Sequence, residues 1–122
     1  MTLERVRAGE AAERRAAEFL AEAGYRILAR RFRTRMGEVD LVAQDGPTVV
    51  FVEVKARSSG AFGGPEAAVD ARKQSRIVKA ALAFLQSRNF SNAPLRFDVV
   101  AVDPAGLRHI PDAFQAPGGY TR

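Results

Sequence analysis

The chain contains two consecutive strand-like segments, residues 37–44 (GEVDLVAQ) and residues 48–57 (TVVFVEVKAR), separated by the strong turn signal Asp45-Gly46-Pro47. Valine, leucine and phenylalanine dominate both segments, so they predict a hairpin that is part of a folded core. Each segment nevertheless carries charged residues, and a charge buried without a partner costs several kcal/mol. The fold must therefore have a reason to keep acids in its sheet.

The register of this hairpin follows from its turn. If the turn is centred between residues 46 and 47, Asp40 lies opposite Glu53, because side chains on one face recur every two residues. The same register places Glu38 opposite Lys55. Asp40 and Glu53 then present like charges across a strand pair, which is destabilising unless a cation or a proton lies between them. The alternative is a pair of cross-strand salt bridges on a solvated face, each contributing under about 1 kcal/mol.

A divalent metal ion would remove this conflict between the two acids. The chain has no cysteine, and its single histidine, His109, comes late in the sequence and is expected to be structural. Carboxylates without histidine or thiolate nearby favour a hard ion, Mg²⁺ or Mn²⁺, which keeps several waters and bridges to substrate phosphates. Lys55 beside such an ion would orient or deprotonate a water, or stabilise the charge that develops on a phosphate.

The remaining segments predict the elements around the hairpin. Residues from about Leu3 to Ala23 indicate an amphipathic helix, residues 25–33 and 95–102 indicate strands, and residues 107–110 indicate a short edge strand. A second long helix is expected over residues 67–85, after a first turn near Pro65. The order α, β, β, β, α, β, β gives an α/β sandwich with a mixed sheet, because a helical crossover can return the fourth strand parallel to a neighbour.

Both predicted helices have an apolar side that is expected to face the sheet. The inward positions of the first helix are Ala12, Ala16, Phe19, Leu20 and Ala23, and those of the second are Ile77, Val78, Ala81, Phe84 and Leu85.

The length of 122 residues corresponds to one domain, which we expect to span residues 1–112, with residues 113–122 forming a flexible C-terminal tail. The absence of cysteine is compatible with a reducing cytoplasm. The chain has neither an apolar secretory segment at its start nor an apolar run long enough to cross a bilayer, so a cytoplasmic protein without a membrane partner is expected.

The formal net charge of +5 favours a polyanionic partner, and nucleic acid is the first expectation. Arginine supplies sixteen of the nineteen basic residues, and its planar group suits phosphate geometry. Two sets are candidates for phosphate contacts: Arg31, Arg33 and Arg35, alternating along one strand face, and Arg72, Lys73, Arg76 and Lys79, on the exposed side of the second helix. The alternative is a charged edge strand and a solvated helix face.

An acid in one strand, followed by acid-x-lysine in the next strand and preceded by an acidic helix, resembles the PD-(D/E)xK nuclease superfamily. Asp40 and the triplet of residues 53–55 carry this resemblance, although Val39 stands where the superfamily motif has proline. More closely, GEAAERRAAEFLAEAGYRILARRFR, GEVDLVAQD and VFVEVKAR resemble the YraN family of small bacterial proteins, whose fold is akin to archaeal Holliday junction resolvases. The resemblance implies a restriction-endonuclease-like αβββαβ(β) sandwich with a mixed central sheet.

The resemblance also implies roles for individual residues. Asp40 and Glu53 would be metal ligands, Lys55 the catalytic lysine, and Glu10 the helical acid near the metal or its water. The helical pattern by itself does not separate Glu10 from Glu13, and it is the resemblance that selects Glu10.

Three further residues are candidates for positions beside the site, and each has an alternative. Glu38 belongs to the acidic patch or pairs with Lys55 or an arginine. Gln74 resembles a helical glutamine that some superfamily members place at the active site, or it is a buried, hydrogen-bonded amide. Asp98 faces the site or pairs with an arginine.

These features together predict a metal-dependent nuclease that hydrolyses phosphodiester bonds of DNA, structured or branched. Symmetric cutting of a junction would require a homodimer. Two other classes remain open: a non-catalytic nucleic-acid-binding domain whose acids are structural, and a nuclease-like adaptor for a DNA repair, recombination or DNA-uptake protein.

Overall fold

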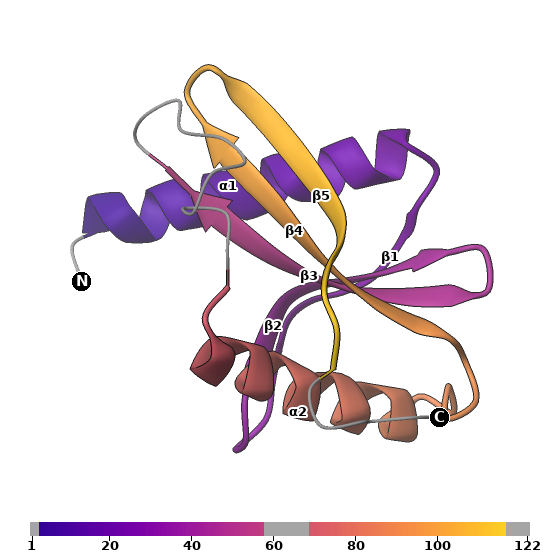
Figure 1. Cartoon of the computed structure of the whole chain (residues 1–122). Coiled ribbons are helices and arrows are strands. Elements are labelled where there is room, and N and C mark those ends of the chain that lie inside the picture. Colours follow the sequence, from indigo (N-terminus) through magenta and orange to yellow (C-terminus); the bar gives the residue numbers. More distant parts are fainter. Residues whose placement is uncertain (1–2, 58–68, 117–122) are drawn as a thin grey trace.

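The computed structural model describes residues 3–57 and 69–116 and shows a twisted sheet with one helix on each face (Figure 1). The described elements are α1 (Leu3–Glu22), β1 (Arg26–Arg33), β2 (Glu38–Asp45), β3 (Thr48–Ala56), α2 (Ala71–Ser87), β4 (Leu95–Asp103) and β5 (Gly106–Phe114). Within these residues, neither helix is sufficiently long and apolar to cross a membrane.

The strands lie in the spatial order β1-β2-β3-β4-β5. β3 and β4 are parallel, and the other neighbours are antiparallel. The parallel pair arises because α2 lies between β3 and β4 in the chain and returns β4 in the direction of β3. The predicted mixed α/β sandwich is therefore confirmed.

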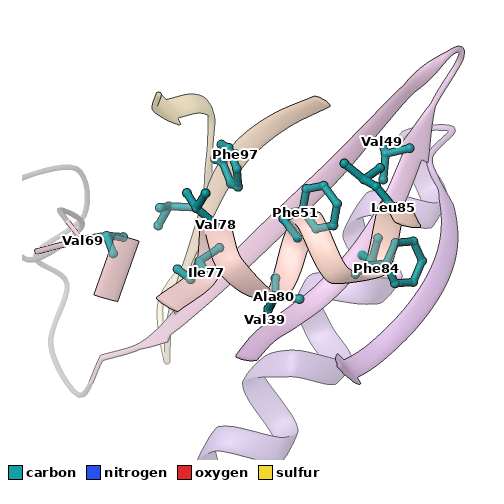
Figure 2. Packing of buried hydrophobic residues seen from close by; sticks show 13 residues of the cluster. Val39, Val49, Phe51, Val69, Ile77, Val78, Ala80, Phe84, Leu85 and Phe97 are labelled. Atoms are coloured by element: carbon teal, nitrogen blue, oxygen red, sulfur yellow. The ribbon is translucent and has the colours of Figure 1, made fainter. Parts of the chain in front are cut away.

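Helix α2 covers one face of the sheet with the five side chains that the sequence pattern placed inward, all of which are buried. Figure 2 shows the side chains of α2 packed with Phe51 and Phe97 of the sheet. Phe84 makes edge-to-face contacts with Phe51 and Phe32, with ring centroids 6.0 and 5.2 Å apart. Burial of one such ring contributes about 1.5–3 kcal/mol, so this cluster fixes α2 on the sheet.

Helix α1 packs on the opposite face through alanines and one leucine, among them Ala12, Ala16 and Leu20, which are buried as predicted. Two other predicted inward positions are wrong. Phe19 is 39% exposed and Ala23 is exposed. The helix ends at Glu22, so Ala23 lies beyond its last turn, and the ring of Phe19 meets the ring of His109 edge-to-face at a centroid distance of 6.0 Å.

The start of α2 differs from the prediction of a helix over residues 67–85. The helix begins at Ala71 because the carboxylate of Asp70 accepts a hydrogen bond of 2.8 Å from the backbone N–H of Lys73 and caps the first turn. Asp70 and the preceding Val69 are not helical. Pro65, the expected first residue of the helix, lies outside the described residues.

The C-terminal strand is longer than the predicted edge strand of residues 107–110. β5 extends to Phe114, whose ring stacks on Phe97 at a centroid distance of 5.0 Å, and Ala116 packs against the same core. Residues 113–116 therefore belong to the folded domain, in contrast to the flexible tail expected over residues 113–122. Residues 117–122 are outside the described part of the chain.

Candidate active site

The acidic residues of the hairpin lie where β2 and β3 part. The two strands pair as far as Leu41 and Val52; beyond that point β2 remains paired with β1, and β3 with β4. Asp40 and Glu53 are the next residues of the two strands, in the register that the turn predicted. Asp40 Oδ2 accepts a hydrogen bond of 2.8 Å from the backbone N–H of Val54. The carboxylate of Asp40 thus accepts from a backbone N–H of β3 that lies beyond the paired part of β2 and β3.

The two carboxyl groups are coupled electrostatically. Glu53 is buried, with 3% of its surface exposed, and Asp40 is half-buried. Burial, together with the charge of Glu53 and a hydrogen bond between the two side chains, raises the pKa of Asp40 to about 7. A proton shared by the pair relieves the repulsion, which is one of the two solutions expected for facing acids.

A lysine from α2 provides the cation that the sequence pattern did not assign to this pair. Lys73 Nζ contacts Glu53 Oε2, although half of the lysine side chain is exposed. Burial lowers the pKa of Lys73, but the hydrogen bond to Glu53 and the nearby negative charges outweigh this effect and raise it. Helical spacing placed Lys73 on an exposed, phosphate-binding side; the long side chain instead brings its charged end to the sheet.

Lys55 lies two residues after Glu53 and is half-buried. Burial lowers the pKa of Lys55, and the positive charges of Arg57 and Lys73 act in the same direction, against the attraction of Glu53. An ammonium with a lowered pKa gives up its proton more readily than an ordinary lysine. The structure therefore brings together Asp40, Glu53 and Lys55, three of the four residues expected at the site.

The fourth residue, Glu10 of α1, does not join this cluster. Glu10 lies 3.6 Å from the guanidinium of Arg31, which is also bonded to Glu13 at 2.8 Å. Glu10 and Asp40 both line a hollow of about 340 Å³ between α1 and the sheet. Throughout residues 3–57 and 69–116, no group of three or more His, Cys, Asp or Glu residues is gathered closely enough to hold a metal ion.

Two of the three arginines predicted along one face of the first strand lie on the same side. Arg31 and Arg33 both line the hollow beside Asp40, although Arg31 has a left-handed backbone with φ of 52°. β1 ends at Arg33, so Arg35 lies in the turn that follows and departs from the predicted face. Arg33 pairs with Glu38 at 3.1 Å, which fulfils the arginine alternative for that acid.

A second hollow, of about 270 Å³, lies on the other side of Glu38 beside the start of α2. Arg72 and Arg76 line it together with Lys73 and Asp70. No ion pair found within the described residues involves Arg72 or Arg76. These two guanidinium groups are therefore available to phosphate oxygens next to the acid pair.

The remaining two candidates have structural contacts. Gln74 Nε2 donates to the carbonyl of Val69 at 2.7 Å, as expected for the hydrogen-bonded amide. Asp98 neighbours Val52 in the parallel ladder and therefore faces α1, on the opposite side of the sheet from Lys73. There it pairs with Arg96 at 2.9 Å and lies 2.7 Å from His109 Nε2. Asp98 is not a neighbour of the candidate site, and His109 has the structural role that was expected.

The donor set of the site suits a hard divalent ion. Asp40 and Glu53 offer carboxylate oxygens, and Mg²⁺ is commonly held by one or two carboxylates with waters and substrate phosphates completing its shell. The repulsion within the acid pair, expressed in the raised pKa of Asp40, gives a cation a reason to bind. The two residues fit such an ion without a third acid.

Comparison with known proteins gives consistent results. The model of the family described as "Uncharacterised protein family UPF0102" matches residues 12–102, a region that contains Asp40, Glu53, Lys55 and Lys73 and begins after Glu10. Two proteins of this family name are similar over nearly the whole chain: one from Syntrophus aciditrophicus is 48% identical, covering 93% of both chains, and one from Symbiobacterium thermophilum is 49% identical, covering 90% of this chain and 98% of the relative.

Among solved structures, a Holliday junction resolvase from Archaeoglobus fulgidus is similar, with a TM-score of 0.52 and 20% sequence identity. The similarity covers 81% of this chain and 72% of the resolvase. At this level of identity the likeness concerns the fold, which is the restriction-endonuclease-like architecture that the resemblance implied.

Proposed function

This chain belongs to the uncharacterised protein family UPF0102, and we propose that it is a metal-dependent nuclease that hydrolyses phosphodiester bonds of DNA. One observation carries the proposal: buried Glu53 and half-buried Asp40 form a mutually repelling pair at the point where two strands part, with Lys55 beside them. Such pairs are costly to keep and cluster at functional sites.

Each residue of the site has a role in this proposal. Asp40 and Glu53 would hold Mg²⁺ or Mn²⁺, which supplies Lewis-acid activation of a phosphate oxygen and of water. Lys55 would orient the attacking water or accept its proton, for which its lowered pKa is favourable. Glu10 lines the hollow next to Asp40 and would position a water rather than ligate directly.

Contacts with the nucleic acid would come mainly from the α2 side. Arg72 and Arg76 line the hollow beside the acid pair, and the chain has a net charge of +5. Arg31 and Arg33 are paired with acids and would contact phosphates only after exchanging these partners. The fold shared with a Holliday junction resolvase supports branched DNA as the substrate, and symmetric cutting would then require a homodimer. A cytoplasmic location is part of this proposal.

The second candidate is a non-catalytic DNA-binding domain, or an adaptor for a protein of DNA repair, recombination or uptake. The contact between Lys73 and Glu53 favours it, because an internal ammonium neutralises part of the acid pair without metal. In that case DNA binding would be insensitive to divalent metal and to Asp40→Asn.

The test incubates purified protein with labelled four-way junction, flap, single-stranded and linear duplex DNA, in Mn²⁺, Mg²⁺ or EDTA. We expect metal-dependent cleavage that falls by at least about 100-fold in Asp40→Asn and in Lys55→Ala. Asp45→Asn and Lys79→Ala are matched controls, because Asp45 is a partly exposed acid at the far end of β2 and Lys79 is an exposed lysine of α2 outside the hollow that Arg72 and Arg76 line. Both should cut as the wild type does.

Absence of cleavage of all four substrates, with DNA binding equal in wild type and variants, would refute the catalytic proposal for these substrates. Cleavage that persists in EDTA or in Asp40→Asn would refute the assigned metal site.

A further inference from the structure

The ion pair between Lys73 and Glu53 links α2 to the most deeply buried acid of the candidate site. Glu53 is 3% exposed, whereas half of the Lys73 side chain is exposed, so the lysine reaches inward from the surface. The ammonium also experiences the negative charges of Asp40 and Glu38. Lys73 thus adds a positive charge in contact with the acid pair to that of Lys55 in β3.

A divalent ion and this ammonium would compete for one oxygen. Mg²⁺ binds carboxylate oxygens at about 2.0–2.1 Å, and Lys73 Nζ already contacts Glu53 Oε2. Two cations held about 4 Å apart repel each other by several kcal/mol at the effective dielectric of a partly buried site. The ion can use Glu53 fully only if the ammonium moves away.

The surroundings of Lys73 provide a place for the displaced ammonium. Its side chain lines the hollow that also contains Arg72 and Arg76, next to the acid pair. Four single bonds in the lysine side chain allow the charged end to swing into this hollow without any movement of α2. The displaced group would add a third cation to a surface that suits phosphate.

We propose that Lys73 is an exchangeable internal counter-ion: it neutralises Glu53 in the metal-free protein, and a divalent ion displaces it towards the phosphate-binding hollow. This inference rests on the proposed metal site. It makes metal binding and nucleic-acid binding mutually reinforcing, because each metal ion bound frees one more cation for phosphate contact.

The test is a calorimetric titration of the full chain with Mn²⁺ alone, comparing wild type with Lys73→Met, which keeps an unbranched side chain one atom shorter and removes its charge. We expect Lys73→Met to bind Mn²⁺ about tenfold more tightly, because the ion no longer displaces an ammonium. Lys79→Met, on the same helix, should bind as the wild type does. In EDTA, Lys73→Met should melt at a lower temperature than Lys79→Met, and Mn²⁺ should raise its melting temperature by more.

Equal or weaker Mn²⁺ binding by Lys73→Met would overturn the exchange, and Lys73→Gln provides a second variant if the methionine form does not fold. Asp40→Asn distinguishes failure of the metal site from failure of the Lys73 exchange. If it abolishes Mn²⁺ binding while Lys73→Met changes nothing, the metal site stands and only the exchange fails. If the wild type binds no Mn²⁺, both fail.

Discussion

Two acidic centres of the same sheet are built differently. Asp98, facing α1, is completely buried; it accepts two hydrogen bonds from Arg96 and one from the backbone N–H of Asp112, and it lies 2.7 Å from His109 Nε2. The pair of Asp40 and Glu53 lies where β2 and β3 part, and Glu53 contacts Lys73 of α2. The pair has one backbone donor, the contact with Lys73 and the hydrogen bond between its own members.

The pKa shifts of the two centres have opposite directions. Burial would raise the pKa of Asp98, but its hydrogen bonds with His109, Arg96 and Asp112 lower it. For Asp40, burial and the neighbouring acid dominate, and its pKa rises to about 7. Burial alone therefore does not set the direction of a pKa shift. The number of hydrogen-bond donors supplied by the surrounding elements decides it.

The largest loss of stability is expected from removal of Asp98, the acid whose hydrogen bonds are all made. Asp98→Ala should lower the free energy of unfolding by about 3–5 kcal/mol, because it leaves Arg96 and His109 without their shared buried partner. Chemical denaturation in EDTA measures this. Asp45→Ala removes the exposed partner of the same arginine and should cost under about 1 kcal/mol. Similar losses in both variants would remove the contrast between the two centres.

A smaller loss of stability is expected from a substitution that disturbs the packing of α2 on the sheet. A Cβ at Gly37, in the turn between β1 and β2, would lie 1.9 Å from the carbonyl oxygen of Arg76, so Gly37→Ala must displace the helix or the turn. We expect a loss of about 1–3 kcal/mol in the free energy of unfolding and weaker Mn²⁺ binding. The NMR signals of the His109 ring, on the other face, should remain unchanged.

Gly9→Ala is the matched control for this substitution. Gly9 lies within α1, and a Cβ there would meet no atom within 4 Å. Alanine should therefore stabilise the helix by up to about 1 kcal/mol. A destabilised Gly9→Ala together with a neutral Gly37→Ala would contradict the close contact between turn and helix.

The smallest effect concerns pH. Protonated Asp40 stabilises the metal-free fold fully below its ordinary pKa of 3.8, and this contribution is lost as the pH rises towards about 7. Asp40→Asn has no such loss, so in EDTA it should gain about 1–2 kcal/mol of stability on the wild type between pH 4 and pH 7.

The pH dependence of the stability contributed by Asp98 has the opposite sign. Because its pKa is lowered in the fold, its contribution is present above its ordinary pKa of 3.8 and is lost as the pH falls below that value. Denaturation of Asp98→Asn and wild type at several pH values should show their difference in stability shrinking in acid. If the stability of the Asp40 and Asp98 variants changed with pH in the same direction, the two centres would not have opposite pKa shifts.

Local signals explain which parts of the fold and site were predictable. The turn at Gly46 and Pro47 fixed the register of the hairpin, and alternation along its strands then placed Asp40 opposite Glu53. The apolar sides of α2 followed from helical spacing. The start of α2 was predicted too early because the capping role of Asp70 was not recognised. The arginine face was predicted too long, because β1 ends at Arg33 and Arg35 lies beyond it, whereas Arg31 and Arg33 line the same hollow.

The sequence by itself determined the order of the elements, the mixed sheet and the facing of Asp40 and Glu53, because these depend on neighbours in the chain and on the two-residue period of a strand. Only the tertiary structure decided that Lys73 meets Glu53 and that Asp98 faces away from the site. Both outcomes depend on how α2 and β4 pack after the crossover. Lys73 lies twenty positions after Glu53 in the chain, and the face on which Asp98 lies is defined only once β4 has joined the sheet. The donors of Asp98 come from the pairing of β4 with β5, whereas the pair of Asp40 and Glu53 receives its lysine from α2.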